Sequence, residues 1–458
     1  MKSIYLIFAL ICLTSTFSFA APTDTNKVSL KEKTAALLMI DDAKKDFYEG
    51  YTRTAIVKFR QALLKDPKNA TAAFWVSKCH NQFKNYGYAL SYAKDALSID
   101  ENVDAEVYFI IADAYHKMNN LNQAVTYYKK CEDEISNYGV KALRIEERIK
   151  ECERFLKDSA EVKGEISKIL LPKKINSGFD DYAPVLSKNG KQLYFVSRRL
   201  DTKGGGINPD DQRFYEDIYL TPWKKNLDEY DSVGNELDML NSIGFDAISA
   251  FNNNASAAYI TLNTSTVEVG RDFTTKGSDI AVSRKDENGK WAKPMMIDDA
   301  NINTSFFEGS ATIDKFANTM IFVSDRNGMN SKSDLYISKK EDAKWGRAVA
   351  LPDNVNTDEN ETTPYLTPDG NYLFFSSNGR DGYGDYDIYV CRNKGGNEWT
   401  DPVNLGPQIN SVTSDTHFQY YPDFGVAFCS TIRLEGEKSS MDIYMIDLEG
   451  MAKTLLPK

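Results

Sequence analysis

Hydrophobic and small residues recur with two different periods along this chain, and the change of period falls near Gly164. From about residue 32 to residue 160 the apolar positions follow the spacing of amphipathic helices, and small residues return about every 34 positions. Small side chains at such positions let two antiparallel helices approach closely. The pattern predicts three helical pairs with their closest contacts at Ala55, Ala62, Ala89, Ala96, Ala124 and Cys131, and a charged helix over residues 140–156 that caps the stack.

From residue 161 to residue 458 the pattern changes to short alternating segments separated by Gly, Asn and Asp, which is typical of many short strands. A unit of about 55 residues recurs five times, and two markers keep the same phase in every unit. One marker is an Asp followed by Ile or Leu, at Asp217, Asp279, Asp334, Asp387 and Asp442. The other is an Asn followed by Ser or Thr, at Asn176, Asn241, Asn303, Asn356 and Asn410.

A unit of four short strands cannot bury both of its faces alone, and radial stacking of five such sheets gives a β-propeller. The fold class is therefore α + β multidomain: an N-terminal all-α solenoid followed by an all-β propeller, joined at residues 157–165. Five motifs favour five blades, while long insertions in the first two units leave six blades open. Ring closure uses a strand at either residues 168–172 or residues 453–457.

An acidic residue follows each marker Asn by five positions and precedes the first strand of its blade. First strands line a propeller channel, so five carboxylates there could form a ring at one mouth that attracts a cation or a basic peptide. The alternative, which we favour, is that each carboxylate accepts backbone hydrogen bonds from the adjoining blade and braces the ring. The five residues are Asp181, Asp246, Glu308, Glu361 and Asp415.

The N-terminus has the features of a secretory signal peptide over residues 1–20, with one Lys ahead of an apolar run and small residues before a cleavage site at Ala21. Cys12 follows a bulky Ile and fits a lipidation site poorly. We expect a linker at residues 21–31, the helical repeats at 32–160 and the propeller at 161–458. No later stretch is long and apolar enough to span a bilayer, so the mature protein is expected in the periplasm.

Composition and residue spacing reduce the number of possible functions further. The formal net charge of −11 disfavours nucleic acid as a partner. The five cysteines after the signal peptide are scattered and do not predict a disulfide framework. At most one pair within residues 79–152 could form a bridge, and we favour buried free thiols. Trp291, Trp345 and Trp399 recur once per unit, a pattern that favours core packing between blades.

The chain offers little for catalysis. It has three histidines and no HExxH, CxxC, GxSxG or P-loop motif, so we expect no enzyme, no catalytic residue, no cofactor-binding residue and no cofactor. The loop at residues 378–387 carries Asn378, Asp381, Asp385 and Asp387, whose oxygens could hold Ca²⁺. We favour turn chemistry there, with Asp387 capping a strand, and therefore expect no metal site.

Both repeat types resemble known families. Ala112, Tyr115, Ala124 and Tyr128 occupy the small and aromatic positions of a tetratricopeptide (TPR) repeat. The segments YLTPDGNYLFFSSNGR and GDYDIYV resemble the PD40 (WD40-like, TolB-type) propeller family. A TPR stack before such a propeller, behind a signal peptide, resembles the PorE-type envelope scaffold of Bacteroidetes type IX secretion and gliding systems, without the OmpA-like domain that those proteins usually carry.

The resemblance implies a non-enzymatic exported scaffold or adaptor for protein–protein interactions in a bacterial envelope assembly. The implied partners are outer-membrane barrels or periplasmic lipoproteins, through which the protein could associate with the outer membrane. The alternative is a periplasmic binding protein whose propeller channel holds a small ligand, a cation or a peptide.

Overall fold

The computed structural model describes residues 28–162, 164, 166–203, 206–208, 213–226, 232–235, 237, 239–242, 244–262, 278–327, 332–436, 438–448 and 456. The expected signal peptide, its cleavage site at Ala21 and Cys12 lie outside these residues. Contacts divide the chain into two compact units, residues 1–69 and residues 70–458. In the described part, no helix combines the length and the apolar character that crossing a membrane requires.

The first unit is one helical hairpin, with α1 at Leu30–Tyr48 and α2 at Thr52–Lys65. Ser29 and Glu32 start α1 with a capping box, because the amide N of Glu32 donates to Ser29 Oγ and the amide N of Ser29 donates to Glu32 Oε2. The small residues Ala55 and Ala62 of α2 are fully buried, as the sequence predicted.

The second unit begins with six helices. Its small residues Ala89, Ala96, Ala124 and Cys131 are fully buried, so the repeat spacing identified the close contacts correctly. Contacts join α3 to α4, α4 to α5, α5 to α6 and α6 to α8. The helices are α3 (Ala70–Gln82), α4 (Tyr86–Ile99), α5 (Glu106–Lys117), α6 (Leu121–Glu134), α7 (Asn137–Ala142) and α8 (Ile145–Glu161).

The single capping helix expected over residues 140–156 is wrong in one respect, because the structure breaks it into α7 and α8. Arg144 adopts the left-handed conformation (φ 53°), which a continuous helix does not allow. Its carbonyl accepts the first hydrogen bond of α8, from the amide N of Arg148, at 3.0 Å. The break redirects the chain so that α8 packs against α6.

Five antiparallel sheets follow, and their first strands, β2, β5, β9, β14 and β19, contact one another in a closed cycle. This arrangement is a five-bladed propeller, which decides the choice between five and six blades. Blades 1 and 2 contain β2 (Asp181–Leu186), β3 (Gln192–Ser197) and β4 (Asp217–Pro222), then β5 (Asp246–Phe251), β6 (Ala257–Leu262), β7 (Asp279–Arg284) and β8 (Met295–Met296). Blade 3 contains β9 (Glu308–Ile313), β10 (Thr319–Ser324), β11 (Asp334–Glu341), β12 (Lys344–Trp345) and β13 (Val349–Ala350).

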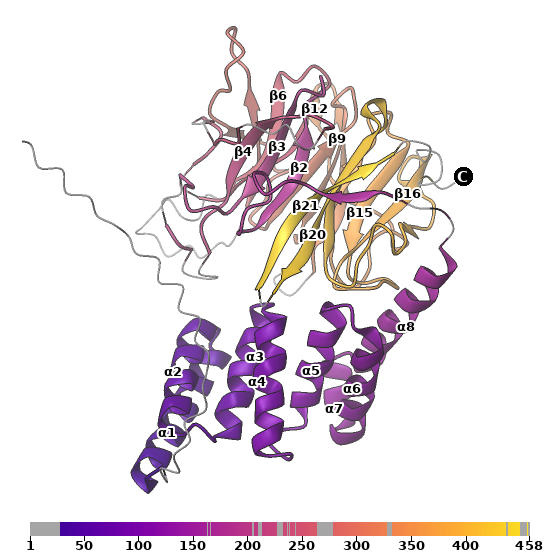
Figure 1. The fold of residues 1–458 in the computed structure, drawn as a ribbon. Coiled ribbons are helices and arrows are strands. Elements are labelled where there is room, and N and C mark those ends of the chain that lie inside the picture. The colour runs from indigo at the N-terminus through magenta and orange to yellow at the C-terminus, as the bar shows by residue number, and fades with distance from the viewer. Residues whose placement is uncertain are drawn as a thin grey trace, which may run out of the picture. The chain divides into compact units, whose positions relative to one another are not determined.

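Blade 4 contains β14 (Glu361–Leu366), β15 (Tyr372–Ser377), β16 (Asp387–Gly395), β17 (Glu398–Trp399) and β18 (Val403–Asn404). Blade 5 contains β19 (Asp415–Tyr421), β20 (Val426–Glu435) and β21 (Lys438–Asp447), and its outer strand is β1 (Lys168–Leu170). In that sheet β1 pairs antiparallel with β21, Ile169 opposite Met445 (Figure 1). The segment at 168–172 therefore contributes the closing strand; of the alternative at 453–457 only Leu456 lies among the described residues.

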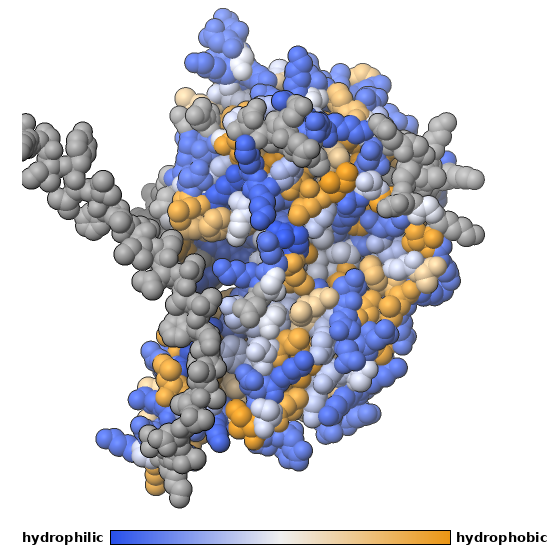
Figure 2. Space-filling model, in the orientation of Figure 1, coloured by the Kyte–Doolittle hydropathy of each residue, from blue (hydrophilic) through white to orange (hydrophobic). Residues whose placement is uncertain are grey.

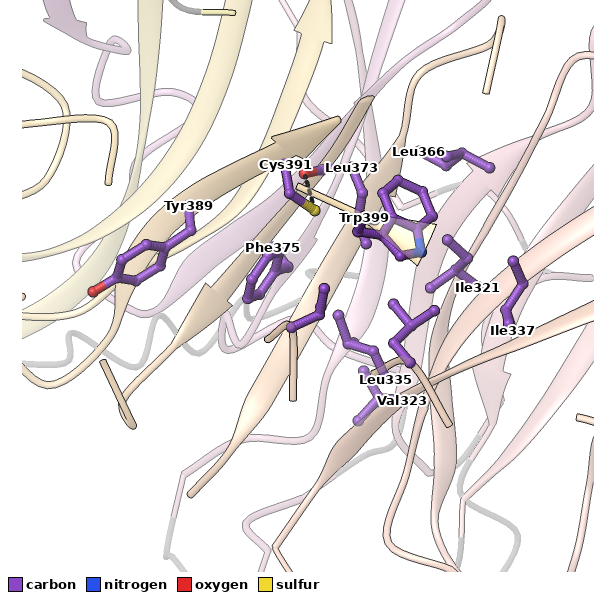
Figure 3. Packing of buried hydrophobic residues seen from close by; sticks show 12 residues of the cluster. Ile321, Val323, Leu335, Ile337, Leu366, Leu373, Phe375, Tyr389, Cys391 and Trp399 are labelled. Carbon is purple, nitrogen blue, oxygen red and sulfur yellow. Dashed lines mark hydrogen bonds between the residues drawn. The ribbon is translucent and has the colours of Figure 1, made fainter. Parts of the chain in front are cut away.

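Hydrophobic side chains fill the spaces between neighbouring blades. In the cluster between blades 3 and 4, Trp399 packs among residues of both sheets, including Ile321 and Leu373 (Figure 3). Trp345 lies in the corresponding cluster between blades 2 and 3, and Trp291 packs against the one between blades 1 and 2. The expected packing role of the three tryptophans is confirmed. Cys79, Cys131, Cys152, Cys391 and Cys429 are buried free thiols.

Candidate functional site

The five acidic residues of the repeat are fully buried at the start of their first strands. Each carboxylate accepts two hydrogen bonds from the Ser or Thr four residues before it, one from the backbone N and one from the hydroxyl. For Glu361 both bonds, from Thr357, measure 2.8 Å. The equivalent pairs are Ser177–Asp181, Ser242–Asp246, Thr304–Glu308 and Ser411–Asp415.

A cation accompanies the acid in several blades. Arg199 lies 2.9 Å from Asp181, and Arg326 lies 3.3 Å from Glu308. In blade 5 the partner of Asp415 is Lys168 of the closing strand, at 3.0 Å. The cations and the remaining donors come from the acid's own blade or, for Lys168, from a strand of the same sheet. The carboxylate hydrogen bonds of the five acids therefore run within the blade and its leading turn. Four of the acids also contact the preceding blade through their backbone, because the amide N of Asp246, Glu308, Glu361 and Asp415 donates to a carbonyl O there.

The side-chain link between blades is made by the marker Asn, five residues before the acid. Asn356 accepts a hydrogen bond from the amide N of Leu335 at 2.9 Å and donates one to the carbonyl O of Leu335 at 3.1 Å. Leu335 belongs to the preceding blade, where it directly follows the marker Asp334. The same two bonds join Asn176 to Ile443, Asn241 to Ile218, Asn303 to Ile280 and Asn410 to Ile388.

The two sequence markers therefore meet at every blade junction. The Asn reaches back to the strand that carries the Asp-Ile/Leu marker, while the adjacent Ser or Thr reaches forward to the acid of its own blade. Together the two residues connect one blade to the next through hydrogen bonds.

The acid of blade 2, Asp246, differs from the other four acids in its hydrogen bonding. Oδ1 of Asp246 is buried and has no hydrogen-bond partner among the described residues, and neither has Oδ1 of Asp217 in the preceding blade. Burial, reinforced by the charge of Asp217, raises the pKa of Asp246 to about 7. In Glu361, by comparison, burial raises the pKa against the opposing hydrogen bonds from Ser377 and Thr357.

The interior of the channel is narrow. Two cavities inside it have volumes of about 20 and 30 Å³, room for about one water molecule each. Their walls are apolar and hydroxyl-bearing, with His417, Gln419 and Lys188 as the exceptions, and none of the five acids lines them. Burial lowers the pKa of His417 to about 4, so the imidazole is neutral at pH 7.

The loop at residues 378–387 has a role that sequence reasoning missed. Asp385 accepts a hydrogen bond from Lys117 Nζ of α5 at 2.8 Å, and His116 Nε2 lies 3.1 Å from the carbonyl O of Tyr383. Although burial opposes its ionisation, the charge of Lys117 holds the pKa of Asp385 well below its usual range. The loop of blade 4 is thus fastened to the last turn of α5.

Helix α8 contacts the same loop. Arg154 donates to the carbonyl O of Gly382 at 2.6 Å and to Asp381 Oδ1 at 2.7 Å, while the Tyr383 hydroxyl donates to Asp158 Oδ2 at 2.8 Å. Asp387 instead accepts from the amide N of Tyr383 and from Asn404. Asp381 and Asp385, two of the loop's candidate Ca²⁺ ligands, thus bind cations of the helices. The available signal was the acidic Gly-rich loop, the basic last turn of α5 and Arg154 within α8, but nothing in the sequence pairs them.

Comparison with known proteins supports the helical part by sequence. The tetratricopeptide repeat family model matches residues 105–137, which cover α5 and α6. No curated protein sequence matches the chain. Among solved structures, the first TPR of Spaghetti (RPAP3) bound to an HSP90 peptide is 17% identical, with a TM-score of 0.24, over 27% of this chain and 95% of that one.

The propeller is similar in fold to endo-arabinase from Bacteroides thetaiotaomicron, at 16% identity and a TM-score of 0.36, over 61% of this chain and 96% of the other. A thermostable family-43 glycoside hydrolase is 13% identical, with a TM-score of 0.37, over 59% of this chain and 90% of that chain. At these identities and scores the likeness carries no argument about activity.

Proposed function

We propose that this chain is a non-enzymatic scaffold that binds other proteins in a bacterial envelope assembly. The observation that carries the proposal is the tetratricopeptide match on α5 and α6, because stacked helical repeats offer extended surfaces for protein partners. The fully buried small residues of α2, α4 and α6 extend the same helix-pair design over three pairs.

The propeller supports a binding role over a hydrolytic one. Glycoside hydrolysis needs two carboxyl groups flanking the scissile bond in a site that admits the substrate. The two cavities inside the described part of the channel hold about one water molecule each, and no carboxylate lines them. A larger pocket at the end of the channel is lined by Asp369 and Asp423, but both carboxylate oxygens of Asp369 accept hydrogen bonds within the protein. The acids at the strand starts are fully buried and engaged with Ser, Thr and cationic side chains.

Exposed apolar side chains on the first hairpin are consistent with a protein partner. Leu37 and Leu38 of α1 are 56% and 67% exposed, and Leu64 of α2 is 81% exposed. On the face drawn in Figure 2, hydrophobic side chains reach the surface of the helical region among hydrophilic ones. Contiguous apolar surface marks interaction sites, and these leucines are the candidates for such a surface on the first hairpin.

The envelope setting rests on the sequence. The signal-peptide features of residues 1–20 support export to the periplasm, and the resemblance to PD40 propellers and to PorE-type scaffolds supports a place in type IX secretion or gliding machinery. The partners we propose are outer-membrane barrels or periplasmic lipoproteins of such a machine.

The proposal is tested by capture followed by reconstitution. The tagged full chain is used to enrich proteins from envelope extract of the source organism, and each enriched protein is purified and titrated against the chain by calorimetry. A saturable 1:1 or symmetric complex supports the scaffold function. Release of reducing sugar from arabinan by the purified chain would overturn it.

A further inference from the structure

A pocket of about 440 Å³ lies at the end of the channel where first strands turn into second strands. Its volume falls in the range that accommodates ligands, unlike the two cavities inside the channel. Turns of blades 1, 2, 4 and 5 contribute to its wall, and Leu456 from the C-terminal end lines it as well. The aromatic residues of the wall are Tyr365, Tyr372, Tyr420, Tyr421 and Phe424, and two prolines, Pro368 and Pro422, lie among them.

Most polar atoms of this wall are already engaged with the protein. The Tyr365 hydroxyl donates to the carbonyl O of Tyr420 at 2.6 Å. The Tyr421 hydroxyl accepts from the amide N of Leu186 at 3.0 Å and donates to Gln419 Oε1 at 3.1 Å. Asp369 Oδ1 accepts from the Thr367 hydroxyl at 2.6 Å, and Asp369 Oδ2 accepts from Asn371 Nδ2 at 2.7 Å. The wall therefore offers ring surface more than hydrogen-bonding capacity.

Lys188 is the exception. Lys188 lines both this pocket and the channel cavity of about 20 Å³. Its side chain is partly buried, and no acid of the described residues forms an ion pair with it. Burial alone lowers the pKa of its ammonium group. The ammonium group of Lys188 can therefore donate a hydrogen bond to a ligand that supplies an acceptor, such as a backbone carbonyl O, and this bond would stabilise the complex.

We propose that this pocket binds an extended, proline-rich peptide of a partner protein. Proline supplies carbonyl acceptors without backbone N–H donors. Such a peptide suits a wall in which Tyr365, Tyr421 and Asp369 already have hydrogen-bond partners and Lys188 has no acidic partner among the described residues. A polyproline II segment loses little conformational entropy on binding, and aromatic-lined grooves are its usual receptors. A saccharide would need hydrogen-bond donors and acceptors from the wall, but Tyr365, Tyr421 and Asp369 already use theirs within the protein.

The rim adds a preference for charge. Asp423 is exposed on the turn between β19 and β20 and lines the pocket beside Phe424. An exposed carboxylate there favours a Lys or Arg next to the prolines over a Glu. This inference deepens the proposed scaffold function and depends on it for the class of ligand.

The experiment measures fluorescence anisotropy of the full chain with a labelled peptide, Pro-Pro-Leu-Pro-Pro-Leu-Pro-Lys. A peptide with Gly in place of every Pro is the matched ligand control, and a Glu in place of the final Lys tests the rim. We expect saturable binding of the proline peptide, about tenfold weaker binding for Lys188→Met and for Tyr372→Ala, and no change for Tyr138→Ala, an exposed tyrosine on α7. Unchanged melting temperatures show that the variants fold.

Equal affinity for the proline and glycine peptides, or equal affinity of the wild type and the two pocket variants, would overturn the inference. Binding of arabino-oligosaccharide in place of the peptide would overturn the choice of ligand. If the reconstituted protein complex forms while the peptide does not bind, only this inference fails. If the peptide binds and no protein complex can be reconstituted, the scaffold function fails instead.

Discussion

Asn176 and Ile443 lie 267 residues apart in the sequence and are joined by two hydrogen bonds. Asn176 Oδ1 accepts from the amide N of Ile443 at 2.8 Å, and Asn176 Nδ2 donates to the carbonyl O of Ile443 at 2.9 Å. The other four junctions have the same contact between residues only 21 to 23 positions apart. The pair of hydrogen bonds that joins neighbouring blades at four junctions therefore also joins the first blade to the last and closes the ring.

Asn176→Asp should open this closure. The carboxylate keeps an acceptor for Ile443 N but loses the donor to the carbonyls of Leu171 and Ile443, which stay buried. We expect a loss of about 1 to 3 kcal/mol in the free energy of unfolding, measured by urea denaturation. Asn288→Asp, on an exposed turn, is the matched control and should change stability by less than about 0.5 kcal/mol. Equal effects of the two substitutions on stability would show that the hydrogen bonds between Asn176 and Ile443 do not stabilise the closed ring.

Glu361→Gln should reveal what the buried acids do. The amide group would place a donor where Glu361 accepts hydrogen bonds from Thr357 and Ser377. If the acid braces its blade, the free energy of unfolding falls by about 1 to 3 kcal/mol and partner binding by the folded protein is unchanged. Glu359→Gln, at a surface ion pair with Lys332, is the control. A stable Glu361→Gln protein with weakened, salt-dependent binding would favour a cation or basic-peptide site.

Asp246 should make stability depend on pH. Its folded pKa of about 7 lies above that of an unfolded aspartate, so its stabilising contribution is complete below about pH 4 and is lost as the pH rises to 7. Asp246→Asn keeps an acceptor for Ser242 and removes this loss, so its melting temperature should exceed that of the wild type at pH 8 and not at pH 4.

Asp415→Asn is the matched control for this pH profile. Asp415 has a cationic partner, which Asp246 lacks among the described residues, because Lys168 Nζ lies 3.0 Å away on a side chain that is only 14% exposed. Its substitution leaves Lys168 without a counter-charge and should lower the melting temperature at pH 8. A destabilised Asp246→Asn at pH 8 would show that a cation from outside the described residues pairs with Asp246.

Asp385→Asn should weaken the attachment of the blade 4 loop to α5. The side chain of Lys117 is 1% exposed, and the substitution would leave its charge buried and unpaired at a cost of about 3 kcal/mol. Lys117→Met removes that charge as well, so the double variant should lose less stability than the sum of the single variants. Additive losses in thermal unfolding would show that the ion pair contributes nothing across this contact.

The sequence was informative wherever a residue recurs. The period located the small residues of α2, α4 and α6, and the phase of the Asn and acidic markers located every blade. It did not show that Asn356 bonds to Leu335, because a period gives one marker per blade and not the direction in which its side chain reaches. We expected the carboxylates to accept backbone hydrogen bonds from the adjoining blade, but the contacts to that blade are made by the Asn side chains and by the backbone N of the acids.

Contacts that occur once were outside the reach of the pattern. Lys117 and Asp385 are 268 residues apart and belong to different repeat types, so neither period relates them. The aromatic pocket draws on Tyr372 at the start of β15 and Phe424 on the turn before β20, which are not equivalent positions of the repeat. The closing strand was ambiguous because two short apolar segments, at 168–172 and 453–457, fit the role equally in sequence.

The most direct test of the scaffold claim is calorimetric titration of the full chain with each envelope protein that it enriches, run beside an assay for sugar release from arabinan. The account predicts a saturable complex with at least one such protein and no sugar release. Substituting all three histidines should leave the affinity of the folded protein unchanged, because no catalytic group is involved. Sugar release above the buffer control, together with the absence of any saturable protein complex, would contradict the account.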